Sequence, residues 1–193
     1  MPLNASRNSL VLPLLGLLVE QPSHAYDLTT RLRDRYGDLS VTRSTVTSLL
    51  KTLERAGQVA ARAPERMGNR PPRTAYEVTE AGLEDFSRRV VEGLSDAQVA
   101  SQDFVMAVAY LAILPAADAA SILDDRAARL GERLTALRQE PAGMPEAYML
   151  EVAYWRNVVA AEAGWIRILA ARIRSRDIDW PHAEPDGPGG TDA

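Results

Sequence analysis

The stretch Thr42-Arg-Ser-Thr-Val-Thr-Ser-Leu-Leu-Lys-Thr-Leu-Glu-Arg-Ala-Gly57 carries the pattern that decides the fold. Val46, Leu49, Leu50 and Leu53 recur at the spacing of one face of an α-helix. The opposite side would carry the polar and charged side chains of Arg43, Ser44, Thr47, Ser48 and Lys51. The hydroxyl of the first residue is a suitable N-cap, and the final glycine suits the left-handed position that ends a helix. The stretch therefore predicts an amphipathic helix, whose role depends on its neighbours.

Two further helices are expected before this stretch. Ser9 is placed to cap a helix that runs to about Val19 and is ended by the Gln-Pro pair at residues 21–22. Ser23 is placed to cap a second helix, which Gly37 would close. Three short helices joined by tight turns, with a polar outer face on the third, are typical of a helix-turn-helix.

A β-hairpin is expected after the third helix. Residues 59–63 and 74–78 are short extended runs on either side of a loop rich in Pro, Gly and Asn, and a helix toward residue 94 follows them. Such a hairpin is typical of the wing of a winged helix, in which basic side chains contact phosphates or the minor groove. A plain connecting loop is the alternative. The basic residues of this loop are Arg66, Arg70 and Arg73.

Positive charge is concentrated around the predicted third helix. The whole chain has a net charge of −4, but residues 1–90 carry 13 Lys and Arg against 10 Asp and Glu, whereas residues 91–193 carry 9 against 16. Between Arg43 and Arg73 there are seven basic residues and two acidic ones. This asymmetry favours a nucleic-acid partner for the first part of the chain.

Composition excludes several functional classes. The chain has 193 residues, of which 46% are hydrophobic, enough for two compact units. The absence of cysteine excludes disulfides and thiolate chemistry, and His24 and His182 have no companion at metal-ligand spacing, so neither a metal nor a cofactor is expected. No catalytic motif is present, so no enzyme is expected. The apolar run at residues 10–19 is too short to span a bilayer and no secretory signal precedes it, which predicts a cytoplasmic protein without a membrane partner.

The second half of the chain is expected to be helical throughout. Residues 98–114 and 119–137 are apolar at helical spacing, and residues 148–175 predict a long helix that is apolar on nearly every side. Such a helix must be buried on more than one side, which in so small a unit indicates a second copy of the chain. Residues 177–193 are acidic and rich in Pro and Gly, and are expected to form a disordered tail, with docking of Trp180 left open.

Four motifs, in order and in register, resemble those of the PadR family of bacterial transcriptional regulators. That family typically has Leu-Gly-Leu-Leu, then Pro-x-His-Gly-Tyr-Glu-Leu, a recognition helix, a wing and Tyr-x-Leu-Thr-Glu-Ala-Gly. This chain has Leu-Gly-Leu-Leu at 15–18, Pro-Ser-His-Ala-Tyr-Asp-Leu at 22–28, Leu-Lys-Thr-Leu-Glu at 50–54 and Tyr-Glu-Val-Thr-Glu-Ala-Gly at 76–82. The resemblance implies a mainly α fold, with a winged helix-turn-helix and a small β-hairpin wing over residues 8–94 and an all-helical dimerisation domain over residues 95–176.

The resemblance further implies a homodimeric repressor that binds a double-stranded DNA operator. Residues near the start of the third helix would reach base edges and Lys51 a phosphate, while His24 and Tyr26 would face the DNA backbone unless Tyr26 belongs to the core. The expected DNA-binding residues are Arg43, Ser44, Thr47, Ser48, Lys51, His24, Tyr26, Arg66, Arg70 and Arg73. The main departure is at residues 42–48, where the family commonly has Ser-Pro-Gly-Thr-Leu-Tyr-Pro and this chain has Thr-Arg-Ser-Thr-Val-Thr-Ser. The family's operator preference therefore does not carry over.

The family also implies a response to small aromatic or cationic hydrophobic ligands. Candidates to line an effector pocket are Phe104, Tyr110, Tyr154, Trp155, Glu162 and Trp165, with the alternative that these residues only fill the core and the interface. Two other classes compete with a PadR-like repressor. A winged helix used only for protein interaction or dimerisation would favour a neutral wing and an apolar outer face on the third helix. A regulator of the MarR type usually has helices on both sides of the winged helix.

Overall fold

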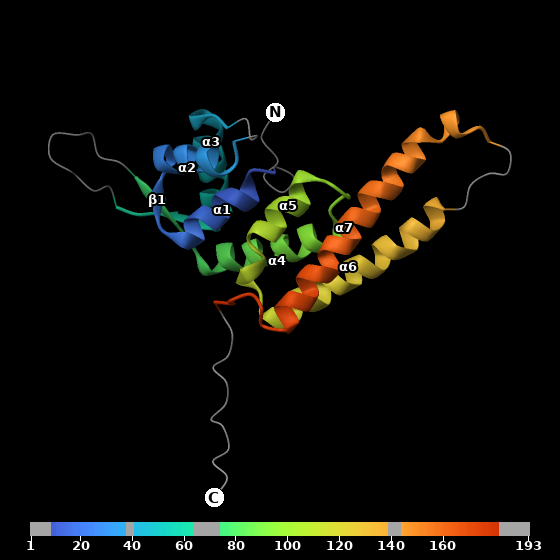
Figure 1. The fold of residues 1–193 in the computed structure, drawn as a ribbon. Coiled ribbons are helices and arrows are strands. Elements are labelled where there is room, and N and C mark those ends of the chain that lie inside the picture. The colour runs from blue at the N-terminus through green and yellow to red at the C-terminus, as the bar shows by residue number, and fades with distance from the viewer. Residues whose placement is uncertain (1–8, 38–40, 64–73, 139–143, 182–193) are drawn as a thin grey trace, which may run out of the picture. The chain divides into compact units, whose positions relative to one another are not determined.

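A computed structural model describes residues 9–37, 41–63, 74–138 and 144–181 (Figure 1). The chain divides into two compact units, Met1–Val90 and Val91–Ala193, and the boundary between them falls inside a helix.

The first unit is a winged helix-turn-helix, as the sequence predicts. Its elements are α1 (Val11–Glu20), β1 (Ser23–His24), α2 (Ala25–Arg35), α3 (Arg43–Arg55), β2 (Val59–Ala61), β3 (Ala75–Val78) and the first part of α4 (Glu80–Asp96). The strands form one antiparallel sheet in the order β1-β3-β2, with Ser23 opposite Tyr76 and Val59 opposite Val78. The predicted hairpin is thus present in β2 and β3, and the strand β1 adds to it.

Strand β1 corrects the predicted start of the second helix. Ser23 is not its N-cap, because Ser23 pairs with β3, and the N-cap residue of α2 is His24, which makes no side-chain cap hydrogen bond. The Ser23 hydroxyl instead donates to the Gln21 carbonyl oxygen at 3.2 Å. The predicted cap of the first helix is also wrong, since Leu10 occupies that position without a side-chain cap bond. The second helix ends at Arg35, before the predicted glycine.

The core of the first unit is made by apolar faces of its helices. Helix α1 is buried along nearly its whole length, from Val11 to Leu18, so its glycine and proline are enclosed as well. Leu28 and Leu32 of α2 and Phe86 of α4 are at most 1% exposed. The four apolar residues predicted to face the core from α3 are fully buried. Burial of this face fixes α3 in position and leaves its polar side outward.

The second unit is helical, also as the sequence predicts. Its elements are the end of α4, α5 (Gln102–Ala109), the 3₁₀ helix η2 (Leu111–Ile113), α6 (Ala116–Leu137), the 3₁₀ helix η3 (Glu146–Tyr148) and α7 (Leu150–Arg174). The long helices α6 and α7 lie side by side (Figure 1, yellow and orange). The expected helix over residues 98–114 starts later, at Gln102, because Ala100 has a left-handed backbone (φ 57°) and Ser101 caps the helix by accepting from the Phe104 N–H. It is also split, since α5 ends before Tyr110 and η2 follows.

Trp180 lies within the segment predicted as a tail and is docked. Its side chain is buried, and its indole N–H donates to the Leu114 carbonyl oxygen at 2.9 Å. The second unit is therefore ordered at least to this residue. Residues 182–193 lie outside the described part of the chain.

Neither a membrane span nor a cluster of metal-binding residues is present in the described part of the chain. No helix there is long and apolar enough to cross a membrane. No group of three or more His, Asp or Glu residues gathers in the described ranges in a way that would hold a metal ion.

Candidate nucleic-acid interface

The position of α3 follows from its two ends and its apolar face. Thr42 caps the helix, with its hydroxyl accepting from the Thr45 N–H at 3.2 Å. The last turn is closed by Gly57, whose φ of 73° is the left-handed conformation that the sequence predicts. With Val46 and Leu50 among the fully buried residues between these ends, the other side of α3 must face outward.

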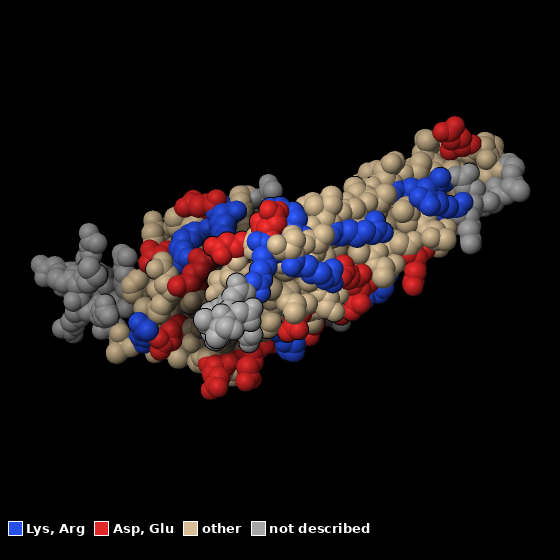
Figure 2. Space-filling model, turned by 60° about the horizontal axis from the view of Figure 1, so that its bottom comes forward, with Lys and Arg blue, Asp and Glu red and all other residues tan. Residues whose placement is uncertain are grey.

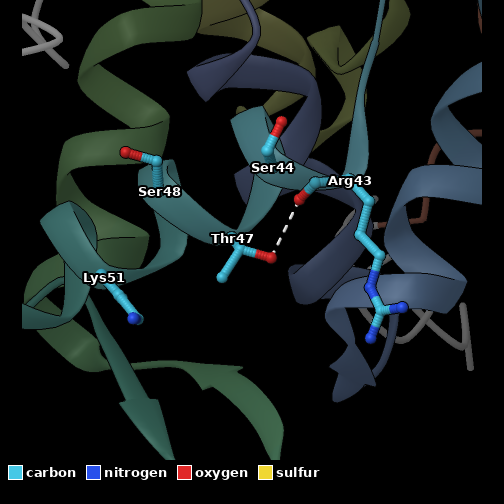
Figure 3. Close-up of a pocket in the computed structure, with 5 residues that line it drawn as sticks. All are labelled: Arg43, Ser44, Thr47, Ser48 and Lys51. Atoms are coloured by element: carbon cyan, nitrogen blue, oxygen red, sulfur yellow. Dashed lines mark hydrogen bonds between the residues drawn. The ribbon is translucent and has the colours of Figure 1, made fainter.

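The outer face of α3 forms a shallow hollow (Figure 3). The side chains that line it are Arg43, Ser44, Thr47, Ser48 and Lys51. These are the five α3 residues that the sequence predicts to contact DNA, and the fold brings all of them onto one surface.

Most basic side chains of the first unit are engaged within the protein. Five arginines form ion pairs: Arg31 and Arg35 with Glu20, Arg62 with Glu77, and Arg88 and Arg89 with Asp85. Two others donate to backbone carbonyl oxygens, Arg33 to that of Val41 and Arg55 to that of Lys51. Among the lysines and arginines in the described part of this unit, only Arg43 and Lys51 have side chains that make no hydrogen bond or ion pair. On the face shown in Figure 2, which draws the whole chain, several basic side chains lie next to acidic ones. The two unpaired cations therefore stand out, and both line the hollow.

The hydroxyl groups of α3 are partly used by the helix itself. The Thr47 hydroxyl donates to the Arg43 carbonyl oxygen at 2.9 Å, and the Thr52 hydroxyl donates to the Ser48 carbonyl oxygen at 3.0 Å. The Ser48 hydroxyl makes no hydrogen bond to any residue that the structure describes. Ser48 is thus available to an incoming donor or acceptor, whereas the proton of Thr47 is not.

His24 and Tyr26 lie in different surroundings. His24 belongs to β1 and is half-buried, and its Nδ1 atom is buried without a hydrogen-bond partner among the described residues. Tyr26 is 56% exposed at the start of α2, so the alternative that it belongs to the core has no support. Tyr26 is free to reach a partner from solvent, and His24 is less accessible.

The wing is described only at its base. Arg62 on β2 and Glu77 on β3 form an ion pair at 2.6 Å across the hairpin. Burial, and then the Glu54 carboxylate of α3, raise the pKa of Tyr76 above its ordinary value of 10.0. The three predicted loop contacts, Arg66, Arg70 and Arg73, lie outside the described residues.

Three of the six candidate effector residues line one cavity in the second unit. The cavity measures about 360 Å³ and is lined by Ala100, Phe104, Val105, Val108, Ala161, Glu162 and Trp165. The rings of Phe104 and Trp165 meet edge to face at 6.4 Å. Tyr110 is buried elsewhere, and Tyr154 and Trp155 are exposed on α7 and contact each other. The fold therefore brings three of the six candidates together and leaves the other three outside this cavity.

Glu162 is held by a buried arginine, Arg126, which is not among the residues predicted from the sequence. Arg126 is 3% exposed, and its Nε and Nη2 atoms donate to Glu162 Oε1 at 3.0 and 2.7 Å. The other carboxylate oxygen accepts from the Ala100 N–H at 2.7 Å. Arg126 also donates to the carbonyl oxygens of residues 94, 95 and 97 at the end of α4 and lies over the Phe104 ring. A signal for it exists in the sequence, because Arg126 lies three residues after Leu123 and four before Leu130, which places a charged residue on the apolar face of the helix.

Comparison with known proteins places the first unit in a family. No curated protein sequence matches the chain. The chain aligns with the crystal structure of Bacillus subtilis PadR in complex with operator DNA at 18% identity, covering 86% of this chain and 99% of that chain, with a TM-score of 0.44. The same coverage and identity, with a TM-score of 0.37, are found for Bacillus subtilis PadR in complex with p-coumaric acid. A PadR-like transcriptional regulator from Bacillus cereus is 15% identical over 86% of this chain and 98% of that chain, with a TM-score of 0.37.

The family match covers the winged helix itself. Residues 14–88 match the model described as the transcriptional regulator PadR-like family. The matched segment runs from α1 into α4 and includes the whole of α3 and the three-stranded sheet. The chain therefore carries a winged-helix domain of the PadR-like family of transcriptional regulators.

Proposed function

We propose that the chain is a sequence-specific DNA-binding transcriptional regulator, a homodimeric repressor whose operator binding is relieved by a small hydrophobic ligand. The observation that carries DNA binding is the outer face of α3. Two cations that have no partner among the described residues, Arg43 and Lys51, share this face with Ser44, Ser48 and Thr47. Phosphates attract such cations, and base edges in the major groove accept and donate hydrogen bonds to such side chains. A face used only for protein contact would be expected to present apolar groups.

The two cations have different roles in this proposal. Arg43 is the first residue of α3, and the N-terminal residues of a recognition helix contact base edges. Its guanidinium can donate two hydrogen bonds to one guanine. Lys51 lies two turns later on the same face and acts as a point charge for a phosphate. Arg43 would therefore contribute sequence preference, and Lys51 affinity for any DNA.

Dimerisation is proposed through the exposed apolar residues of α7. Leu150, Tyr154, Trp165 and Ile168 are exposed although α6 covers the neighbouring face of the same helix. A second copy that buries them would form a two-fold symmetric dimer, which presents two recognition helices to the operator. In a dimeric helix-turn-helix protein the two recognition helices bind half-sites about 34 Å apart. A pseudo-palindromic operator is the expected target.

DNA binding is tested by a salt series on DNA from upstream of the gene for this protein. The logarithm of the binding constant should fall linearly with the logarithm of salt concentration, with a slope near −0.9 for each phosphate contact. Lys51→Ala should reduce that slope by about 1 and weaken all sequences similarly. Arg35→Ala is the matched control, since it removes a cation that already contacts Glu20. If no complex forms at low salt, the chain is a winged helix for protein interaction and not a repressor.

The proposed ligand site is the cavity between α5 and α7. Its walls are mainly apolar, with the Phe104 and Trp165 rings in edge-to-face contact, and its volume of about 360 Å³ suits a small molecule. Both carboxylate oxygens of Glu162 already accept hydrogen bonds, from Arg126 and from the Ala100 N–H. An uncharged aromatic compound is therefore favoured over a cationic one.

Fluorescence measures ligand binding at this cavity. The chain has three tryptophans, and of these only Trp165 lines the cavity. Titration with uncharged aromatic compounds should change the emission of the wild type and of Trp155→Phe, but should leave Trp165→Phe almost unchanged. A compound that acts in this way should also weaken the complex with operator DNA. If quaternary ammonium compounds of the same size bind equally well, the preference for an uncharged ligand is wrong.

A further inference from the structure

We infer that Thr47 contacts the C5-methyl group of a thymine in the operator half-site. This inference rests on the proposed DNA binding by α3 and adds the identity of one base that the helix recognises. It starts from a hydrogen bond inside the helix, the one from the Thr47 hydroxyl to the Arg43 carbonyl oxygen at 2.9 Å.

That hydrogen bond determines which group of Thr47 is presented to a partner. A threonine side chain carries a hydroxyl and a methyl group on the same carbon, so fixing the hydroxyl on the backbone also fixes the direction of the methyl. In Figure 3 the methyl carbon of Thr47 points away from the accepting carbonyl oxygen. The proton that the hydroxyl would offer to a base is already in use, and the methyl group remains.

The place of Thr47 within the hollow makes it the central contact. It lies one turn after Arg43 and Ser44 and one turn before Lys51 on the same face. Among the five side chains that line the hollow, Thr47 is the one that carries a methyl group. Thymine is the base that presents a methyl group in the major groove, and apolar contact with it is how a threonine methyl distinguishes thymine from cytosine.

The neighbouring side chains do not offer the same contact. Arg43 and Lys51 present charged groups, and Ser44 shares a hydrogen bond with the Thr42 hydroxyl at 2.9 Å. Ser48 presents a hydroxyl that makes no hydrogen bond to the described residues, so it suits a hydrogen-bonding base edge. A thymine methyl facing the middle of α3 therefore meets Thr47.

The test replaces thymine by deoxyuridine, which lacks only the C5-methyl group. A half-site is first obtained by selection from random DNA, and each of its thymines is then replaced in turn. The wild type should lose about fourfold in affinity at one position, the loss expected for one buried methyl group. Thr47→Ser should lose a similar amount on the thymine site and show no further loss with deoxyuridine there, because the two methyl groups act as one contact.

Two further variants separate this contact from other effects. Thr52→Ser makes the same chemical change on the same helix. Thr52 has the same kind of hydrogen bond to the backbone but does not line the hollow, so this variant should keep the full deoxyuridine effect. Thr47→Val keeps a methyl group and removes the hydroxyl, and it should keep both the affinity and the deoxyuridine effect.

The outcomes are distinguishable from failure of DNA binding itself. Three results would overturn the inference while the repressor proposal stands. The selected half-site could lack thymine, the wild type could be insensitive to deoxyuridine at every position, or Thr47→Ser could show the same deoxyuridine effect as the wild type. A large loss with Thr47→Val would show that the hydroxyl contacts the base and would also overturn it. If the wild type binds no DNA at all, both proposals fail together.

Discussion

At the scale of single residues, a cation on α3 can contact DNA only if its side chain is not already bonded within the protein. Arg43 and Arg55 lie at the two ends of α3, and both are exposed. The Arg55 guanidinium donates to the Lys51 carbonyl oxygen at 3.1 Å and to the Thr52 hydroxyl at 3.3 Å, which satisfies part of its donor set at the C-terminal end of the helix. Arg43 has no such partner within the described residues. Its five donors are therefore free for a base edge.

This difference makes the two arginines a matched pair of substitutions. Arg43→Ala should cost about 1–3 kcal/mol on the best operator and flatten the base preference at one position. Arg55→Ala should leave that preference unchanged, because its side chain is engaged at the far end of the helix. Selection from random DNA followed by sequencing measures both profiles. A profile that is the same for Arg43→Ala and the wild type would contradict a base contact by Arg43.

The sequence predicted the face of α3 but not the pairing of charges. Helical spacing alone assigned Leu49 to the core and Ser48 to the outer face, because side-chain direction in a helix follows from position. Pairing depends on residues that only the fold brings together, as with Arg62 and Glu77. Arg126 and Glu162 likewise come together only because α6 packs against α7.

At the scale of secondary structure, the junction between the sheet and α4 depends on one glycine. A Cβ atom at Gly82 would lie 1.8 Å from the Gln58 carbonyl oxygen and 2.9 Å from a methyl carbon of Val78. The same turn is held by Thr79, whose hydroxyl donates to the Gly57 carbonyl oxygen at 2.6 Å and accepts from the Gly82 N–H at 3.0 Å. The start of α4 is thus pressed against the residues that follow α3.

Gly82→Ala should therefore destabilise the first unit. A contact this short with a backbone oxygen cannot be relieved by a rotamer change, so the expected cost is about 1–3 kcal/mol or more. Gly131→Ala in α6 is the control, because its Cβ would meet only an Arg167 nitrogen at 3.8 Å, and it should stabilise the chain by about 0.5–1 kcal/mol. Thermal unfolding followed by circular dichroism distinguishes them. Equal midpoints for the two variants would rule out the close approach at Gly82.

Short elements are also where sequence-based prediction was weakest. The two-residue strand β1 gives no alternation of apolar and polar residues, and it exists because Ser23 meets Tyr76 across the sheet. From the sequence alone, Ser23 is therefore predicted to be the N-cap of the second helix. The long helices α6 and α7 were predicted well, since a repeated apolar spacing over many residues is a strong signal. The start of α5 at Gln102 was harder to predict, because the Ala100 N–H just before it donates to Glu162, which lies 62 residues later.

The Arg126–Glu162 pair should hold the helices of the second unit together. Arg126→Met leaves a carboxylate that is 10% exposed without its cation, and loss of one partner of a buried pair costs about 3–5 kcal/mol. Arg129→Met removes an exposed arginine with one hydrogen bond to Ser95 and should cost little. All three tryptophans belong to this unit, so urea unfolding followed by their fluorescence reports on it. Equal midpoints for these variants would show that the pair does not stabilise the unit.

At the scale of the whole molecule, α7 has more apolar surface than one chain buries. Val159, Ala163, Ile166 and Ala170 are fully buried on one side of the helix. On another side, Leu150 and Tyr154 are exposed four residues apart, and Trp165 and Ile168 are exposed three residues apart. The 11 residues between Tyr154 and Trp165 are about three helical turns, so the two pairs lie on the same side of the helix. Apolar surface arranged in such a row is typical of a helix that pairs with another helix. A homodimer through α7 would cover this row.

Ile168→Glu tests the dimer without disturbing the chain itself. Ile168 is 63% exposed, so a charged side chain there should be tolerated in a single chain, but it should be strongly unfavourable if a second copy covers it. Sedimentation equilibrium should give a dimer for the wild type and for Ile168→Leu, and a monomer for Ile168→Glu. The monomer should keep the wild-type circular dichroism and bind single half-sites, but it should lose most of its affinity for a two-fold operator, because two linked half-sites no longer bind together. A dimeric Ile168→Glu with unchanged operator affinity would place the interface elsewhere, since a buried glutamate at its centre would not be tolerated.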